Sequence, residues 1–299
     1  DAHTNVGSAG RLHSFPILPY WFADGLVVVA AGAEQRELIG ARVVKIGDMD
    51  AEEACGKAEA VFAFENRATM RDRSPRYAMM GEVAEAVGLT ADAKRMTVTL
   101  KPRAPEGAER SVVLEWMKPG ENYVGLETDN AKLPLYRQRR GTANWCEWLE
   151  KERVVYFQYA RCGDEAGQTV AEISQKVMGM IEEKGAERLI VDLRNNGGGN
   201  SALLNAFIFD LKSTVIGQRP GGVIVLIGRR TFSSAELNAA ALKNRVGAVL
   251  IGEPTGQKPN AYGEVKTFQL PRSGLNVQYS TKFFRTEEGE RESLEPDVL

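Results

Sequence analysis

Two neighbouring serines carry a chemical signal in this sequence. Ser233 and Ser234 follow the apolar segment 223–227, and a helix is expected to begin at Ala235. A serine at a strand-to-helix turn exposes its hydroxyl, and the next backbone N–H can stabilise an oxyanion, as in a nucleophile elbow. A serine before a helix is also a common N-cap, here with Glu236 in the first turn. Taken alone, the pattern favours the cap.

A glycine-rich turn forms a second corner of the same kind. Gly197, Gly198 and Gly199 follow the apolar segment 189–193, and a helix is expected near Ser201. Glycines let a backbone approach a ligand closely, and the free N–H groups of a helix N-terminus favour an anion, whether a phosphate or an oxyanion. Three glycines after a strand more often form only a tight turn. The interest lies in the two corners together, because they could face each other.

Composition and charge narrow the classes of function. The chain has 299 residues, which predicts about two domains at roughly 150 residues each. Apolar residues make up 43% and charged residues 26%, the balance of an ordinary globular protein. The net charge of −2 argues against nucleic acid or an anionic membrane as the main partner. The longest apolar runs fall far short of the ~20 residues that span a bilayer, so no membrane span is expected.

Cysteines and histidines are too few and too scattered to form a metal site. Cys55, Cys146 and Cys162 are widely spaced and odd in number, so they predict neither a zinc site nor a disulfide framework. The only histidines are His3 and His13. We therefore expect no metal and no other cofactor. The sequence opens without an initiator methionine, so we expect a processed or trimmed N-terminus, and the lack of a signal peptide says nothing about export.

Residues 14–118 are predicted to form a small β-rich unit. Short apolar runs bounded by glycine and polar turns indicate strands, whereas apolar residues at a spacing of three and four indicate a helix. The expected elements are strands at 25–30 and 40–49, a short helix after Asp50, a helix from about Ser74 to Gly88, and a hairpin that pairs 96–100 with 111–116.

Residues 119–299 alternate between strand and helix patterns. Thr169 and Glu172 form a capping-box pattern at the start of a helix. This part of the chain also contains continuous apolar segments, which are typical of strands covered on both faces. Their alternation with helices predicts an α/β unit with a parallel sheet. These segments are 154–159, 189–193, 223–227 and 248–251.

Five ordered segments resemble the S41 family of serine peptidases, which includes the C-terminal (tail-specific) processing proteases and the tricorn core proteases. They are Asp-Ala-His-Thr at 1–4, Asp-Leu-Arg-Asn-Asn-Gly-Gly-Gly-Asn at 192–200, Thr-Phe-Ser-Ser-Ala-Glu at 231–236, Gly-Glu-Pro-Thr-Gly at 252–256 and Glu-Pro-Asp-Val at 295–298. The resemblance covers nearly the whole chain, and it is stronger after residue 119 than before it.

The resemblance implies an architecture and a substrate class. Residues 119–299 would form a crotonase-like (ClpP-like) α/β catalytic core, 14–118 a PDZ-like domain and 1–13 an N-terminal segment of the catalytic region. The chain would be an endopeptidase that acts on unstructured or C-terminal peptide segments. By resemblance we also expect an exported protein, periplasmic or extracellular. The oligomeric state stays open.

The resemblance also assigns roles to individual residues. Ser233, three residues before the family's glutamate, would be the nucleophile. The backbone N–H groups of Ser234 and Gly198 would form the oxyanion hole. Within the PDZ-like domain, a short apolar strand after a polar turn suits the addition of a peptide strand, so Gly25, Leu26 and Val27 are expected to line a peptide groove.

The family offers two solutions for the general base. Lys258 stands 25 residues after Ser233, where the processing proteases carry a catalytic lysine, but Tyr262 replaces the glutamine that orients it there. In the tricorn-like branch a histidine is the base, and His3 and Glu290 stand at the positions of that histidine and its orienting carboxylate. Ala2 replaces the serine that precedes the family's histidine. We favour His3 with Glu290, because imidazole needs no large pKa shift near neutral pH, whereas a lysine must be desolvated.

Two other classes of function remain open on the sequence. One is a catalytically weak relative that keeps the fold and serves as a PDZ-type peptide-binding module. The other is a crotonase-like acyl-transfer or CoA-thioester enzyme, since a shared fold does not fix a function. The PDZ-like unit and the serine at a strand-to-helix corner count against the second.

Overall fold

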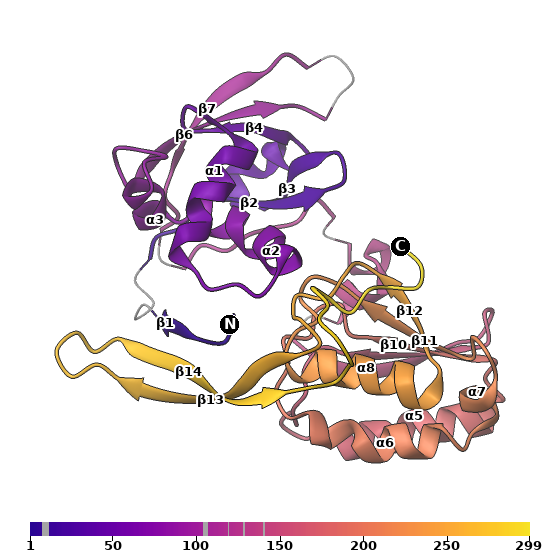
Figure 1. The fold of residues 1–299 in the computed structure, drawn as a ribbon. Helices are drawn as coiled ribbons and strands as arrows, with labels where there is room; N and C mark the ends of the chain where they lie inside the picture. The colour runs from indigo at the N-terminus through magenta and orange to yellow at the C-terminus, as the bar shows by residue number, and fades with distance from the viewer. Residues whose placement is uncertain (8–11, 104–106, 119, 128, 140) are drawn as a thin grey trace. The chain divides into compact units, whose positions relative to one another are not determined.

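The structure is a computed structural model that describes residues 1–299 except 8–11, 104–106, 119, 128 and 140 (Figure 1). Contacts within the chain divide it into two units, which we describe separately. Unit 1 comprises Asp1–Phe64, Met70–Leu133 and Glu264–Ser280, and unit 2 comprises Glu65–Thr69, Pro134–Gly263 and Thr281–Leu299. Helix α2 (Arg67–Ala78) begins in unit 2 and continues in unit 1.

Unit 2 contains a five-stranded sheet in the order β12-β11-β10-β9-β8. Strands β9 to β12 are parallel, and β8 is antiparallel to β9. The continuous apolar segments of the sequence form β9 to β12, as predicted, whereas β8 was not predicted. The strands are β8 (Asn144–Leu149), β9 (Val154–Tyr159), β10 (Arg188–Asp192), β11 (Val223–Ile227) and β12 (Val249–Gly252).

Three helices of unit 2 gather on one side of this sheet (Figure 1). They are α5 (Val170–Lys184), α6 (Asn205–Leu211) and α8 (Ser234–Val246), with α6 packed against α5 and α8. The capping box predicted at Thr169 and Glu172 is present, and Gly185 ends α5 in the left-handed conformation. Shorter segments are α4 (Leu135–Gln138), η4 (Ser201–Leu204) and α7 (Val215–Gln218).

The carboxyl ends of three adjacent strands position the candidate chemistry. The glycine-rich corner follows β10, the serine corner follows β11, and the segment 253–260 follows β12. Because β10, β11 and β12 are parallel neighbours, these three segments emerge at the same edge of the sheet, which is where open α/β sheets bind ligands.

Unit 1 contains a six-stranded antiparallel sheet, with strand order β2-β3-β4-β6-β7 and β5 paired to β4. The hairpin predicted from 96–100 and 111–116 is confirmed as β6 and β7. The strands are β2 (Ile17–Phe22), β3 (Gly25–Ala31), β4 (Arg42–Ile46), β5 (Met49–Asp50), β6 (Arg95–Lys101) and β7 (Arg110–Glu115). The helical segments besides α2 are η1 (Ala33–Leu38), α1 (Ala51–Ala58), η2 (Glu59–Val61), α3 (Gly81–Ala86) and η3 (Asn130–Lys132).

The helix predicted from about Ser74 to Gly88 is wrong. Two helices, α2 and α3, take its place, and the chain between them is extended at Met80. The break has a non-local cause. Ser14 pairs with Met80, and the Phe15 N–H donates to the carbonyl of Met79 at 2.9 Å. A segment more than sixty residues earlier therefore takes hydrogen bonds that a continuous helix would have used.

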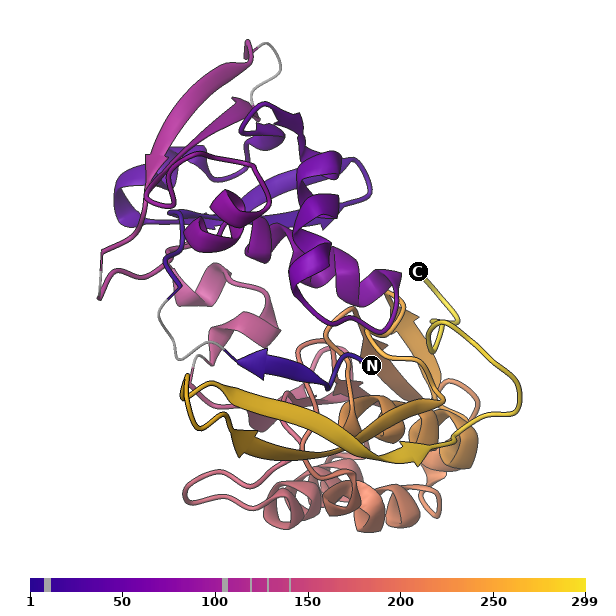
Figure 2. The same cartoon turned by 60° about the vertical axis from the view of Figure 1, so that its left-hand side comes forward.

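A long hairpin carries the N-terminal strand. Strands β13 (Ala261–Gln269) and β14 (Asn276–Phe284) form it, and β1 (Asn5–Gly7) lies antiparallel along β14 (Figure 2). The outer part of the hairpin, 264–280, belongs to unit 1 together with β1. The expected boundaries therefore differ from the observed division, because 1–13 and 264–280 both belong to unit 1.

The expected boundary at 118/119 also differs from the observed one. Residues up to Leu133 belong to unit 1. Val124 and Ala31 exchange backbone hydrogen bonds at 2.7 and 3.1 Å, and the Tyr123 hydroxyl donates to the carbonyl of Phe15 at 2.9 Å. These contacts keep the segment after residue 119 with the β-rich unit.

All three cysteines are free and buried, Cys55 in unit 1 and Cys146 and Cys162 in unit 2. Burial raises the pKa of the Cys55 thiol to about 12 and that of Cys162 to about 11. Among the described helices, none combines the length and the apolar character needed to cross a bilayer. Within the described ranges, no group of three or more histidine, cysteine or acidic side chains is arranged to hold a metal ion.

Candidate active site

Ser233 has a strained backbone at the N-terminus of α8. Its φ is 56° and its ψ is −126°, a conformation in which non-glycine residues are rare. An N-cap residue has a negative φ and uses its side-chain oxygen to accept a helix N–H. Among the described residues, the Ser233 side chain makes no such bond. Ser233 as a whole is half-buried.

The serine corner and the glycine corner are in direct contact. Gly198 has a φ of 108°, and a side chain added there would place its Cβ 2.6 Å from the Cβ of Ser233. The Phe232 N–H donates to the carbonyl of Asn196 at 3.1 Å, and the Ser234 hydroxyl donates to the carbonyl of Gly199 at 2.7 Å. The sequence-based idea that the two corners face each other therefore holds, and only glycine fits at position 198.

Buried side chains hold the glycine corner from behind. The Asn196 side chain donates to the carbonyl of Tyr159 at 2.7 Å and accepts the Gly198 N–H at 2.9 Å. The Cys162 N–H donates to the carbonyl of Gly198 at 3.0 Å, and the Asn200 N–H donates to the carbonyl of Cys162 at 2.7 Å. The Gly198 N–H, an expected oxyanion donor, thus already has an acceptor in this arrangement.

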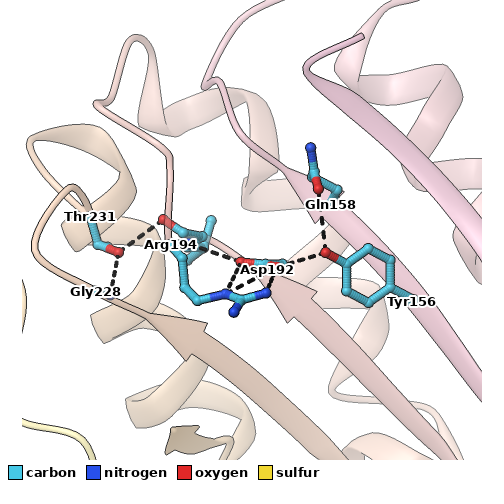
Figure 3. A network of polar contacts seen from close by, with 7 residues as sticks. Tyr156, Gln158, Asp192, Arg194, Gly228 and Thr231 are labelled. Carbon is cyan, nitrogen blue, oxygen red and sulfur yellow. Dashed lines mark hydrogen bonds and ion pairs between the residues drawn. The ribbon is translucent and has the colours of Figure 1, made fainter. Parts of the chain in front are cut away.

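An ionic network fixes the ends of the strands that lead into both corners (Figure 3). The Arg194 guanidinium lies along the Asp192 carboxylate, with Nη2 at 2.5 Å from Oδ2, and the Tyr156 hydroxyl donates to the same oxygen at 2.6 Å. Burial and the Asp192 carboxylate raise the pKa of Tyr156, so its hydroxyl stays a donor. The Thr231 hydroxyl donates to the carbonyl of Leu193 at 2.9 Å and accepts the Gly228 N–H at 3.0 Å, which joins the turn after β11 to the end of β10.

Glu236, in the first turn of α8, is an unusual carboxyl group. Its exposed fraction is 0%, and neither side-chain oxygen has a hydrogen-bond partner among the described residues. Burial, reinforced by the Glu287 carboxylate, raises its pKa to about 8. Glu236 is therefore neutral at pH 7 and does not cap its own helix.

Lys258 forms an ion pair in this structure. Its Nζ lies 2.8 Å from Glu292 Oε1, and 30% of the side chain is exposed. The hydrogen bond that Lys258 donates to Glu292 raises the pKa of Lys258 above its ordinary value. The ion pair therefore favours the charged lysine, whereas a general base has to be neutral. Glu290 lies in the exposed segment after β14, close enough for its charge to contribute to the same shift.

His3 belongs to unit 1, so it is described apart from Ser233. Its side chain is buried, and Nδ1 lies 3.5 Å from the Asp1 carboxylate. The Gln278 side chain donates to the His3 carbonyl at 2.8 Å, which ties the segment to β14. His3 is thus ordered beside an acidic partner and is not a frayed terminal residue.

The structure places Gly25, Leu26 and Val27, the residues expected to line a peptide groove, within a sheet. These residues lie in β3, which pairs with β2 on one side and with β4 on the other at Val27. At Val27 both neighbouring positions are taken, so no peptide strand can add to β3 at that residue. Gly25 and Leu26 instead border a pocket of about 390 Å³ in unit 1, which Arg42 and Lys101 also line.

The comparison with known families decides how this site is named. The model of peptidase family S41 matches residues 153–299, which include both corners and the segment after β12. Residues 153–299 belong to peptidase family S41. The chain is a serine-type peptidase, a hydrolase whose substrates are peptides or proteins.

The mixed α/β fold of this S41 peptidase is similar to solved structures of CPAF. Mature CPAF superposes with a TM-score of 0.66 at 16% identity, covering 100% of this chain and 80% of that chain. Mature CPAF complexed with lactacystin gives 0.65 at 15% identity, with the same coverage. At these identities the likeness is one of fold.

Residues that support the S41 site were missed by sequence reasoning. Gln257 accepts the Ser233 N–H through its side chain at 2.9 Å, and Asn196 joins the two corners. Asn196 lies inside the quoted family segment, so its position was visible. Gln257 lies beside Lys258 in a loop, and nothing in the local pattern distinguishes it.

Proposed function

We propose that this S41 peptidase is an endopeptidase that cleaves unstructured or C-terminal segments through an acyl-enzyme on Ser233. The carrying observation is the strained Ser233 backbone beside Gly198, with a hydroxyl that is not used as a helix cap. Ser233 Oγ attacks the scissile carbonyl, the base takes the hydroxyl proton, and that proton passes to the leaving amine. Water then hydrolyses the ester and regenerates Ser233.

The oxyanion would be bound by two backbone N–H groups. Ser234 is the first residue of α8, where N–H groups have no partner within the helix. The Gly198 N–H donates to Asn196 in the free enzyme, so it would be shared between that side chain and the oxyanion, or would turn toward the oxyanion. The glycines on either side of Gly198 permit such a turn.

His3 is our preferred general base, with Glu290 as the residue that orients it. The ion pair between Lys258 and Glu292 supports this choice, because it favours the protonated lysine. A histidine at its ordinary pKa of ~6.5 accepts a proton near neutral pH without any such obstacle. The assignment requires His3 of unit 1 to reach Ser233 of unit 2 in the working enzyme.

Unit 1 would hold the substrate chain as a PDZ-like domain, and unit 2 would be a crotonase-like core. The pocket bordered by Gly25 and Leu26 supports a binding role, because Arg42 or Lys101 could pair with a peptide carboxylate there. The pocket is mixed in charge, because its lining also contains the acidic residues Asp50, Glu52 and Glu109. The structural likeness to CPAF spans the whole of this chain, unit 1 included. From the resemblance to the S41 family we propose that the protein is exported.

The test compares two adjacent serines. Ser233→Ala should abolish labelling by a fluorophosphonate probe and lower kcat on an unstructured peptide by roughly 10⁴–10⁶-fold. Ser234→Ala is the matched control. Its kcat should stay within about tenfold of wild type, because Ser234 acts through its backbone N–H and not through its hydroxyl. Circular dichroism should show both variants folded.

Three results would contradict the proposal. Labelling of Ser234 in place of Ser233 would mean that the register of the nucleophile is wrong. Peptide binding by a wild-type protein that neither labels nor cleaves would favour a binding module. Turnover of a CoA thioester without peptide cleavage would favour an acyl-transfer enzyme.

A further inference from the structure

The backbone N–H of Ser233 is bonded outside its own helix. At Thr169, another helix start with glutamate three residues later, Glu172 accepts the backbone N–H of the cap residue at 2.7 Å. At Ser233 the corresponding Glu236 is buried and does not accept the backbone N–H of the cap residue. Gln257 Oε1 accepts the Ser233 N–H instead, at 2.9 Å. The acceptor that fixes the Ser233 backbone therefore comes from the segment after β12.

Gln257 is held firmly enough to act as that acceptor. Its exposed fraction is 4%, and its carbonyl accepts the Thr255 hydroxyl at 3.0 Å. The Thr255 hydroxyl in turn accepts the Leu294 N–H at 3.0 Å, and the Thr255 N–H donates to the Leu294 carbonyl at 3.2 Å. The Gly256 N–H donates to the carbonyl of Thr231 at 3.1 Å, just before the serine corner. The loop thus has little freedom to move.

A segment from far earlier in the sequence secures this loop. The Asn66 side-chain nitrogen, in a residue that is 3% exposed, donates to the carbonyls of Thr255 at 3.0 Å and Glu292 at 2.6 Å and lies 2.9 Å from the Ser293 hydroxyl. The Asn66 side-chain oxygen accepts the Thr69 N–H at 2.9 Å, which caps α2. The Thr69 hydroxyl donates to the carbonyl of Gly256. Residues 65–69 belong to unit 2, so every one of these contacts lies within a single unit.

We propose that Gln257 is a positioning residue for Ser233, and that Asn66 and Thr69 keep Gln257 in place. A serine with φ of 56° tends to relax to the negative φ of an ordinary N-cap, and its hydroxyl would then turn to the helix N–H groups. The bond from the Ser233 N–H to Gln257 opposes that relaxation and keeps the hydroxyl free. This inference rests on the proposed role of Ser233 as nucleophile.

The primary test removes the acceptor without changing the size of the side chain. Gln257→Met should lower both the rate of fluorophosphonate labelling at Ser233 and kcat by about 100-fold, the typical result of a small misplacement of a reacting group, with KM unchanged. Gln257→Glu keeps an oxygen at the same place and should recover the labelling rate to within about tenfold of wild type.

Two further variants test the supporting segment. Thr69→Val removes only the hydroxyl that donates to Gly256, and Asn66→Asp keeps the cap of α2 but loses the side-chain donor. Each should slow labelling about tenfold. Thr169→Ala is the control, because it removes a helix cap at a distance from the corners. It should lower the melting temperature without changing the labelling rate of the folded protein.

The outcomes separate this inference from the function it rests on. If wild-type protein is not labelled at Ser233, the proposed function fails. If wild type is labelled and Gln257→Met is labelled as fast, Gln257 does not position Ser233. If Gln257→Met and Gln257→Glu slow labelling equally, or only in proportion to the unfolded fraction measured by circular dichroism, the role of Gln257 is structural and the inference is wrong. If Asn66→Asp fails to fold, Thr69→Val decides the role of the supporting segment.

Discussion

Glu172 and Glu236 stand at the same position of their helices, three residues after the cap, and they behave differently. Glu172 is exposed and accepts hydrogen bonds from the backbone and hydroxyl of Thr169, which lowers its pKa. Glu236 is completely buried, and its pKa is raised to about 8. The sequence pattern is shared, so the surroundings decide whether the carboxyl group caps the helix or is neutral in the interior.

Glu236 should make the stability of the enzyme depend on pH. Because its folded-state pKa lies above the ordinary value of 4.5, the folded protein holds a proton that the unfolded chain releases between pH 4.5 and about 8. The free energy of unfolding should therefore fall as the pH rises through that range, by up to roughly 1.4 kcal/mol per pH unit. Glu236→Gln should flatten this dependence in urea unfolding measured from pH 5 to 8.

The matched control for Glu236 is an exposed carboxylate. Glu290→Gln should leave the slope of stability against pH as in wild type, since Glu290 lies at the surface. A Glu236→Gln protein with the wild-type slope would show that Glu236 is charged when folded.

The identity of the base can be tested through the ion pair at Lys258. If His3 is the base, kcat should rise through about pH 6–7. His3→Ala should then lower kcat by several orders of magnitude, and Lys258→Ala should lower it much less. Glu292→Gln removes the partner that raises the pKa of Lys258, so a lysine base would then work faster at neutral pH. Unchanged activity in Glu292→Gln supports the histidine, and an increase contradicts it.

At the scale of elements, the parallel strands β9 to β12 of unit 2 were predictable and the helices of unit 1 less so. Continuous apolar segments such as Val223–Ile227 form strands that are covered on both faces, so the apolar pattern alone is enough to predict the strand. The break between α2 and α3 depends on pairing with Ser14, which no local window contains. Periodicity across Met79 and Met80 fits one helix, and tertiary hydrogen bonds override it.

Two glycines of unit 1 give opposite predictions. A Cβ at Gly81 would lie 1.9 Å from the carbonyl oxygen of Ala93, so Gly81→Ala forces the backbone to move. The substitution should lower the free energy of unfolding by about 1–3 kcal/mol, the usual penalty of overpacking. A Cβ at Gly56, in the exposed part of α1, meets nothing within 4 Å, so Gly56→Ala should stabilise by about 0.5–1 kcal/mol. Chemical unfolding of both variants measures the difference, and equal effects would contradict the structure here.

For the whole molecule, the sequence predicted that two corners lie together, but not how the chain divides into its two units. The two corners at the ends of β10 and β11 were predictable, because parallel strands bring their carboxyl ends together. The division of the chain was not. Residues 65–69 contribute to unit 2 and 264–280 to unit 1, through contacts between segments far apart in the sequence. Asn66 and Ser293 are 227 positions apart, and His3 and Gln278 are 275 positions apart. Local patterns carry no information on such pairs.

Substrate length should reveal the contribution of unit 1. If the pocket beside Gly25 binds the peptide carboxylate, Arg42→Ala should raise KM for a long peptide severalfold and leave hydrolysis of a small activated ester unchanged. Lys45→Ala, an exposed lysine of the same strand that does not line the pocket, is the control. An Arg42→Ala enzyme with wild-type KM for long peptides would exclude this pocket.

The burial of every cysteine gives a way to observe each unit opening. Alkylating reagents require an accessible thiolate, and burial withholds both the access and the ionised form. Modification of Cys55 therefore reports local opening of unit 1, and modification of Cys146 or Cys162 reports local opening of unit 2. Mass spectrometry of time-quenched samples would then record two local opening rates in a single tube, without any introduced label.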